Sequence, residues 1–123
     1  MVIIALIDRN PVFCQGLRTL LEQVAGFCVI EVPASCAVRV LQRNPPFDVV
    51  LVDEDLYREH RDDIRSAGMA NPVMKTLMMV MDRDDLIGIP DGVEKILKFS
   101  VKREFEVKIK RLAAVEFLER NRW

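Results

Sequence analysis

The chain is poor in the residues that build disulfide frameworks and zinc sites. Its 123 residues include three cysteines, Cys14, Cys28 and Cys36, and one histidine, His60. The cysteines are odd in number and lack the paired spacing of metal ligands, and a single histidine does not complete a zinc site with them. They are typical of reduced thiols, so we expect a cytoplasmic protein.

The sequence also lacks a strong charge excess and a long apolar run. Its 18 Lys and Arg residues nearly balance 19 Asp and Glu residues, so no global field for nucleic acid is indicated. The apolar first seven residues have no basic segment before them and are followed directly by Asp8 and Arg9. No apolar stretch approaches the roughly 18 to 20 residues of a membrane span. We therefore expect no signal peptide and no membrane segment, and the length predicts a single domain over residues 1–123.

The sequence does contain short apolar runs, rich in branched residues, at fairly regular intervals. Four runs cover residues 2–7, 27–32, 49–52 and 76–81, and a weaker fifth covers 95–97. They show no clean alternation of apolar and polar residues, which favours strands buried on both faces of a parallel sheet. Core packing is the expected role of the methionines around the fourth run, which are Met74, Met78, Met79 and Met81.

The segments between these runs are expected to be helices. Asn10 is placed to cap a helix that starts at Pro11 and that Gly26 terminates, and a long helix is expected over 101–120. The inward stripes are Phe13, Leu17, Leu20, Leu21 and Val24 in the first of these helices, and Val101, Phe105, Ile109 and Leu112 in the last.

The other connections carry weaker helical patterns. A short helix is expected over 35–43. The strongly charged segment 58–67 offers only Ile64 as a clear anchor and is expected to be mobile or irregular. Residues 86–90 leave room for at most a short helix before the chain reaches Pro90.

The alternation of strand and helix predicts a doubly wound α/β fold. With right-handed crossovers, five strand–helix units form a doubly wound, three-layer (βα)5 sandwich, for which the flavodoxin-like strand order 2-1-3-4-5 is the natural expectation. In such folds the chemistry collects at the carboxyl ends of the strands. The residues expected there are Asp8, Arg9, Asp53, Asp55 and Met81.

Three strand ends carry a recognisable combination of residues. Asp8 and Arg9 follow the first strand, Asp53 closes the third, and Lys98 follows the fifth in Leu97-Lys98-Phe99-Ser100. In this combination the chain resembles the receiver domain of bacterial two-component response regulators, most closely the kind that precedes a helix-turn-helix output domain. The resemblance covers the chain from Ile3 to about Leu112.

The resemblance implies a role for each of these side chains. It makes Asp53 the phosphoryl acceptor, Lys98 the cation that contacts the phosphate, and Asp8 part of the acidic pocket. Carboxylate attack on a phosphoryl group requires positive charge to offset the phosphate oxygens, and Lys and Mg²⁺ usually supply it.

The chain departs from the family pattern at four places. Arg9 stands where receivers carry a second acid that ligates Mg²⁺, and Met81 stands at the switch position usually held by Ser or Thr. Lys95 falls near the position of the usual aromatic switch residue in the last strand, and the segment after Asp53 lacks the Pro-Gly loop. A thioether donates no hydrogen bond, so Met81 is not expected to follow a phosphate.

Arg9 bears most directly on the metal. It removes one oxygen ligand and adds repulsion, which leaves Asp8, Asp53 and the carbonyl of Asp55 to hold Mg²⁺ weakly. If its side chain points inward, it pairs with Asp8 or Asp53 and fixes one conformation.

These observations leave more than one function open. We expect a non-enzymatic receiver with weakened or lost phosphorylation at Asp53, which acts through contacts with a sensor histidine kinase, another signalling protein or its own copy. The alternative is a fully working receiver that controls a DNA-binding output domain outside these residues. The last helix has no docking motif for DNA, so direct nucleic-acid binding by this domain is not expected. A phosphatase of the haloacid dehalogenase kind would use Asp8 as nucleophile, but Asn10 replaces its general acid.

Overall fold

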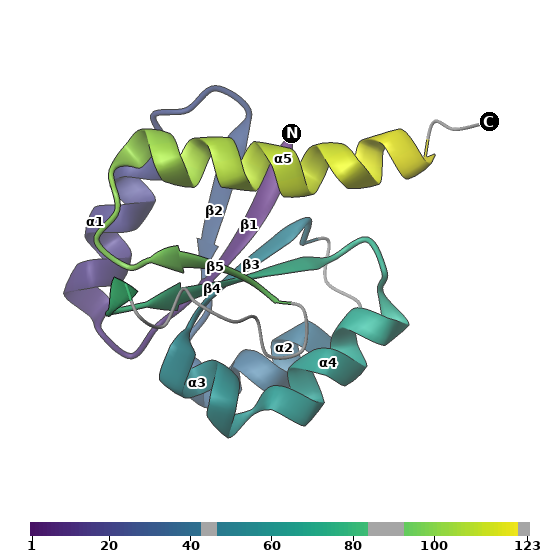
Figure 1. The fold of residues 1–123 in the computed structure, drawn as a ribbon. Coiled ribbons are helices and arrows are strands. Elements are labelled where there is room, and N and C mark those ends of the chain that lie inside the picture. Colours follow the sequence, from purple (N-terminus) through teal and green to yellow (C-terminus); the bar gives the residue numbers. More distant parts are fainter. Residues whose placement is uncertain (43–46, 84–92, 121–123) are drawn as a thin grey trace.

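The computed structural model describes residues 1–42, 47–83 and 93–120, with the side chains of Val38 and of 115–120 left aside (Figure 1). Five strands form one parallel sheet in the order β2-β1-β3-β4-β5, which confirms the predicted flavodoxin-like order. The strands are β1 (Val2–Ile7), β2 (Phe27–Glu31), β3 (Val49–Asp53), β4 (Lys75–Val80) and β5 (Glu94–Leu97).

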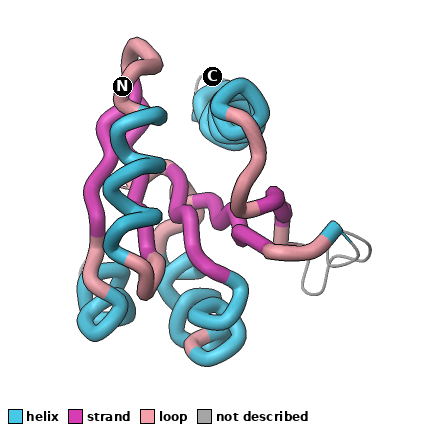
Figure 2. The backbone as a smooth tube through the Cα atoms, turned by 90° about the vertical axis from the view of Figure 1, so that its left-hand side faces the viewer, coloured by secondary structure: helices cyan, strands magenta, loops and turns pink. Residues whose placement is uncertain are grey.

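Helices cover both faces of this sheet and make three layers. Figure 1 shows α5 running across one face and α2, α3 and α4 gathered on the other, and Figure 2 shows the same layers from the side. The helices are α1 (Pro11–Leu21), α2 (Ala37–Gln42), α3 (Glu54–Glu59), α4 (Arg61–Ala70) and α5 (Lys102–Arg120), with a 3-10 turn, η1 (Ala34–Cys36), before α2.

The central strands serve two separate cores. Within β1, Ile4 and Leu6 pack on the side of α1 and α5, whereas Ala5 and Ile7 pack on the side of α2, α3 and α4. All four are essentially inaccessible to water. Because both faces of the sheet are covered, every position in the strand is apolar, which is why the sequence shows runs rather than alternation.

Helix α1 begins as predicted but ends earlier. The Asn10 Oδ1 accepts a hydrogen bond from the Phe13 amide at 3.1 Å, and Pro11 occupies the first turn. The helix ends at Leu21, and Gly26, with φ of 89°, lies in the turn that enters β2 rather than at the helix terminus. The prediction that Leu20 faces inward was wrong, since it is 43% exposed.

The charged segment after β3 is helical, contrary to the expected irregular structure. It forms α3 and α4, which bury Leu56 and Tyr57 in the first helix and Ile64 and Ala67 in the second. A few apolar anchors at helical spacing are enough, because the charged residues lie on the outer faces.

Two further apolar positions were assigned to the core wrongly. Met81 is 65% exposed because it follows the last residue of β4, and Val101 is 68% exposed because it precedes the first residue of α5. The short helix expected over 86–90 and the side chain of Val38 lie outside the described residues. Across the described ranges, no helix is both long enough and apolar enough to span a membrane.

Candidate functional site

The carboxyl ends of β1, β3 and β5 bring Asp8, Asp53 and Lys98 together. The Lys98 Nζ lies 2.6 Å from the Asp8 Oδ2 and 3.3 Å from the Asp53 Oδ1. The side chain of Lys98 is 12% exposed, that of Asp8 3% and that of Asp53 15%, so water screens these ion pairs poorly. We call these three residues the buried triad; the sequence predicted all three.

The second oxygen of each carboxylate is held by a backbone amide. The Asp8 Oδ1 accepts a hydrogen bond from the Asn10 amide at 2.8 Å. The Asp53 Oδ2 accepts one from the Asp55 amide at 3.1 Å, which makes Asp53 the N-cap of α3. The helix therefore starts directly after Asp53, where receivers usually carry a Pro-Gly loop, and both carboxylates are fixed in orientation.

An aromatic ring completes the surroundings of the lysine. The Lys98 Nζ lies 4.7 Å from the centre of the Phe13 ring, and Phe13 meets Phe99 edge-to-face at 5.7 Å. Burial lowers the pKa of Lys98, but the carboxylates of Asp8 and Asp53 outweigh burial and raise it above its ordinary value. Lys98 is therefore charged at neutral pH. Sequence reasoning placed Phe13 only in the core stripe of α1 and missed this contact.

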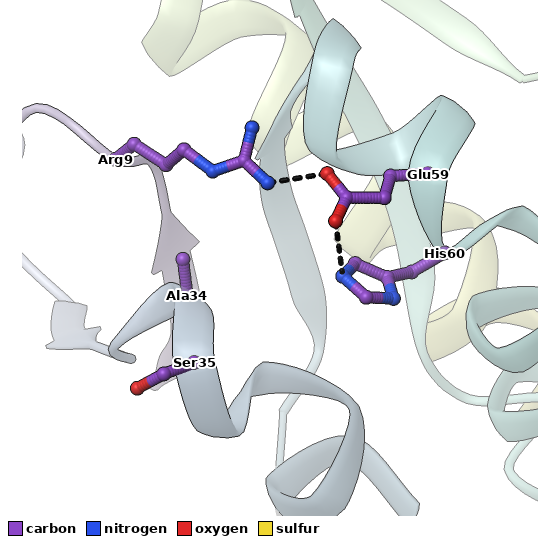
Figure 3. Close-up of a pocket in the computed structure, with 5 residues that line it drawn as sticks. All are labelled: Arg9, Ala34, Ser35, Glu59 and His60. Carbon is purple, nitrogen blue, oxygen red and sulfur yellow. Dashed lines mark hydrogen bonds and ion pairs between the residues drawn. The ribbon is translucent and has the colours of Figure 1, made fainter.

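Arg9 does not enter the buried triad. Its guanidinium pairs instead with the Glu59 carboxylate at the end of α3, and the other Glu59 oxygen lies 3.7 Å from the His60 Nε2 (Figure 3). Arg9 therefore does not point inward, which was the condition for its expected pair with Asp8 or Asp53. We call Arg9, Glu59 and His60 the rim cluster.

The rim cluster lines an open depression. Figure 3 shows Arg9 on one side, Glu59 and His60 on another, and Ala34 and Ser35 of η1 below them. The depression has a volume of about 510 Å³. The side chains of Arg9 and Glu59 are 56% and 51% exposed, so this ion pair stands in water. Sequence reasoning assigned no role to Glu59 or His60, and no local motif marks either residue.

The oxygen donors fit a magnesium ion poorly. Mg²⁺ requires near-octahedral oxygen ligands, whereas Asp8 and Asp53 each share an oxygen with the Lys98 ammonium. Over the described ranges, no three side chains among His, Cys, Asp and Glu are grouped so that they could hold a metal. Asp55 is exposed at the start of α3 and contributes its backbone amide to Asp53.

The remaining positions lie close to this edge without joining the triad. Met81 stands exposed just beyond β4, and Lys95, near the usual place of the aromatic switch residue, is only 7% exposed in β5. The Cys14 Sγ lies 3.6 Å from the Asp8 carbonyl oxygen, and burial together with the Asp8 charge raises the pKa of this thiol to about 11. Cys14 is therefore a protonated thiol at neutral pH and a poor nucleophile.

The order of the strands and the helices on both faces of the sheet are the fold of solved response regulator receiver domains. One solved receiver domain, from Clostridium thermocellum, is 20% identical to the chain with a TM-score of 0.79, over 96% of this chain and 98% of that one. A CheY-like receiver domain from Methanospirillum hungatei is 21% identical with a TM-score of 0.77, over 97% and 98%.

A third structure carries the same fold in a named regulator class. It is a LuxR family DNA-binding response regulator from Silicibacter pomeroyi, 15% identical with a TM-score of 0.68, over 93% of this chain and 92% of that one. No family model matches the chain, and no curated protein matches it in sequence. At these identities the likeness shows the fold, and the function has to be argued from the site.

Proposed function

We propose that this chain is a receiver-like signalling domain in which Mg²⁺-dependent phosphorylation of Asp53 is weakened or lost, and which acts through contacts with other proteins. The observation that supports this proposal is the set of charged side chains at the carboxyl ends of the strands. Lys98 is in contact with both Asp8 and Asp53, and the position of the second acid is held by Arg9.

This charge arrangement disfavours phosphoryl transfer for two reasons. A phosphoryl group on Asp53 needs a divalent ion to offset the negative charge of its oxygens. The oxygen ligands for such an ion lack one carboxylate, because Arg9 replaces the second acid and its guanidinium adds positive charge. Both carboxylate oxygens of Asp53 also have partners already: one pairs with the Lys98 ammonium, and the other accepts a hydrogen bond from the Asp55 amide in the first turn of α3. These contacts fix one conformation of the edge without a metal.

A working receiver is the second candidate, and one observation favours it. Lys98 contacts both Asp53 and Asp8, so the positive charge that a phosphoryl group on Asp53 would need is already at hand. In that case the domain would switch an output domain, for example a DNA-binding one, in response to phosphorylation.

Proteins are the proposed partners in either case. A sensor histidine kinase is the expected partner of a working receiver, whereas a receiver without phosphorylation would bind a signalling protein or a second copy of itself. We do not assign nucleic-acid binding or enzymatic turnover to this domain, and the proposal places it in the cytoplasm.

The deciding experiment is intact-mass measurement after incubation with Mg²⁺ and a small-molecule phosphodonor. We expect the wild type to gain no phosphoryl group, and Arg9→Asp, which restores the second acid, to gain one that Arg9→Asp/Asp53→Asn does not. Asparagine caps helices as well as aspartate does, so the Asp53→Asn change leaves the start of α3 intact.

Arg18→Asp is the matched control, because Arg18 is another exposed arginine in ion pairs, with Glu22 and Glu31, away from the site. It should gain nothing. A phosphoryl gain in the wild type that disappears in Asp53→Asn would contradict the proposal and establish the working receiver.

A further inference from the structure

The position of the Arg9 side chain depends on one residue of α3. Arg9 leaves the end of β1 beside the buried triad, yet its guanidinium lies on the rim with Glu59 (Figure 3). The two residues are 50 positions apart in sequence, so the fold and not the local chain brings them together.

The guanidinium has a second set of acids within electrostatic range. Glu59 has the largest effect on Arg9 and raises its pKa, and the more distant Asp53 and Asp55 raise it in the same direction. A long arginine side chain moves between such partners by rotating about its own bonds. Without Glu59, the acids that still attract the guanidinium are Asp53 and Asp55, and the cost of removing the guanidinium from water opposes them.

We propose that Glu59 is a positioning residue that holds the Arg9 guanidinium on the rim and so keeps its charge away from the pocket of Asp8 and Asp53. The inference rests on the proposed function, in which Arg9 opposes cation binding, and it adds that Glu59 sets how strongly Arg9 does so. Removal of the Glu59 charge lets Arg9 move toward Asp53, where it excludes a divalent cation more strongly.

The test is a double-mutant cycle read by nuclear magnetic resonance on the whole chain. Mn²⁺, a paramagnetic ion that takes the same carboxylate oxygens as Mg²⁺, is titrated into wild type, Glu59→Gln, Arg9→Gln and the double variant. Broadening of the Asp8 and Asp53 amide signals reports the apparent affinity, and the Arg9 Nη–H signals report its ion pair, which is made through Nη2, without any metal.

We expect Glu59→Gln to weaken Mn²⁺ binding about threefold when Arg9 is present and to leave it unchanged in the Arg9→Gln background. The Arg9 Nη–H signals should shift in Glu59→Gln. Glu22→Gln, which breaks the exposed pair with Arg18, is the matched control and should change neither signal.

Several results would overturn the inference. Equal weakening in both backgrounds would mean that Glu59 acts through its own charge. Arg9 Nη–H signals that do not move in Glu59→Gln would mean that the pair is not formed. Absence of broadening in all four proteins would show that the position of Arg9 does not control cation access. Phosphorylation of the wild type at Asp53 would instead refute the proposed function, and the cycle would still decide whether Glu59 positions Arg9.

Discussion

Two ion-pair clusters lie at the same edge of the sheet and differ in how far water reaches them. In the buried triad, the side chains of Asp8, Asp53 and Lys98 are at most 15% exposed, whereas in the rim cluster Arg9 and Glu59 are about half exposed. The same kind of contact therefore has different consequences. Removing one partner of a buried pair leaves an uncompensated charge, while an exposed pair exchanges its partner for water at little cost.

The largest expected effect comes from breaking the buried triad. Lys98→Met leaves the carboxylates of Asp8 and Asp53 next to one another without their cation, and we expect it to lower the free energy of unfolding by about 3 kcal/mol. Urea denaturation measures this change. Asp8→Asn in the Lys98→Met background should recover part of the loss, because it removes one of the unpaired charges.

The matched control for this comparison is Lys110→Met. Lys110 is a 55% exposed lysine that pairs with Glu106 on α5, and its removal should leave stability nearly unchanged. Equal losses for Lys98→Met and Lys110→Met would contradict the difference drawn between buried and exposed pairs.

A smaller effect is expected from high pH. The pKa of Lys98 is raised in the folded state by Asp8 and Asp53 against the effect of burial, so its contribution is complete below the unfolded lysine pKa of about 10.4. The contribution is lost as pH rises through the higher folded pKa. The stability difference between wild type and Lys98→Met, measured by denaturation from pH 8 upward, should therefore shrink only in the strongly alkaline range. A difference that stays constant there would show that Lys98 stabilises the fold through packing and not through its charge.

The smallest effect is expected at the rim. Arg9→Gln and Glu59→Gln should each leave the denaturation midpoint unchanged, and the little that changes should disappear in molar salt, which screens exposed charges. Midpoints measured at low and high NaCl test this. A large loss of stability in either variant, insensitive to salt, would show that the rim pair is stronger than its exposure suggests.

The parts of the structure that follow from local patterns could be predicted from the sequence. The strands were found nearly to the residue because burial on both faces leaves a continuous apolar run. The meeting of Asp8, Asp53 and Lys98 followed because each side chain stands at the carboxyl end of a parallel strand. Helix α1 was placed by Asn10 and Pro11, although the sequence did not show that it ends at Leu21.

What could not be predicted depends on partners distant in the sequence. The direction of Arg9 is decided by Glu59, and the ring over Lys98 belongs to Phe13 at the other end of the chain. The charged segment after β3 was misjudged because its helices are stabilised by a few buried anchors that its composition conceals. Phosphorylation, metal binding and partners stay predictions.

The N-cap role of Asp53 bears on how such domains are interpreted across evolution. An acid at the end of β3 is usually taken as a record of phosphorylation, yet here the carboxylate also starts α3 and pairs with Lys98. The start of α3 and the pairing of a buried lysine each use this carboxylate, whether or not Asp53 accepts a phosphoryl group. An aspartate at the end of this strand is therefore weaker evidence of phosphorylation than the identity of its neighbours, above all the residue at position 9.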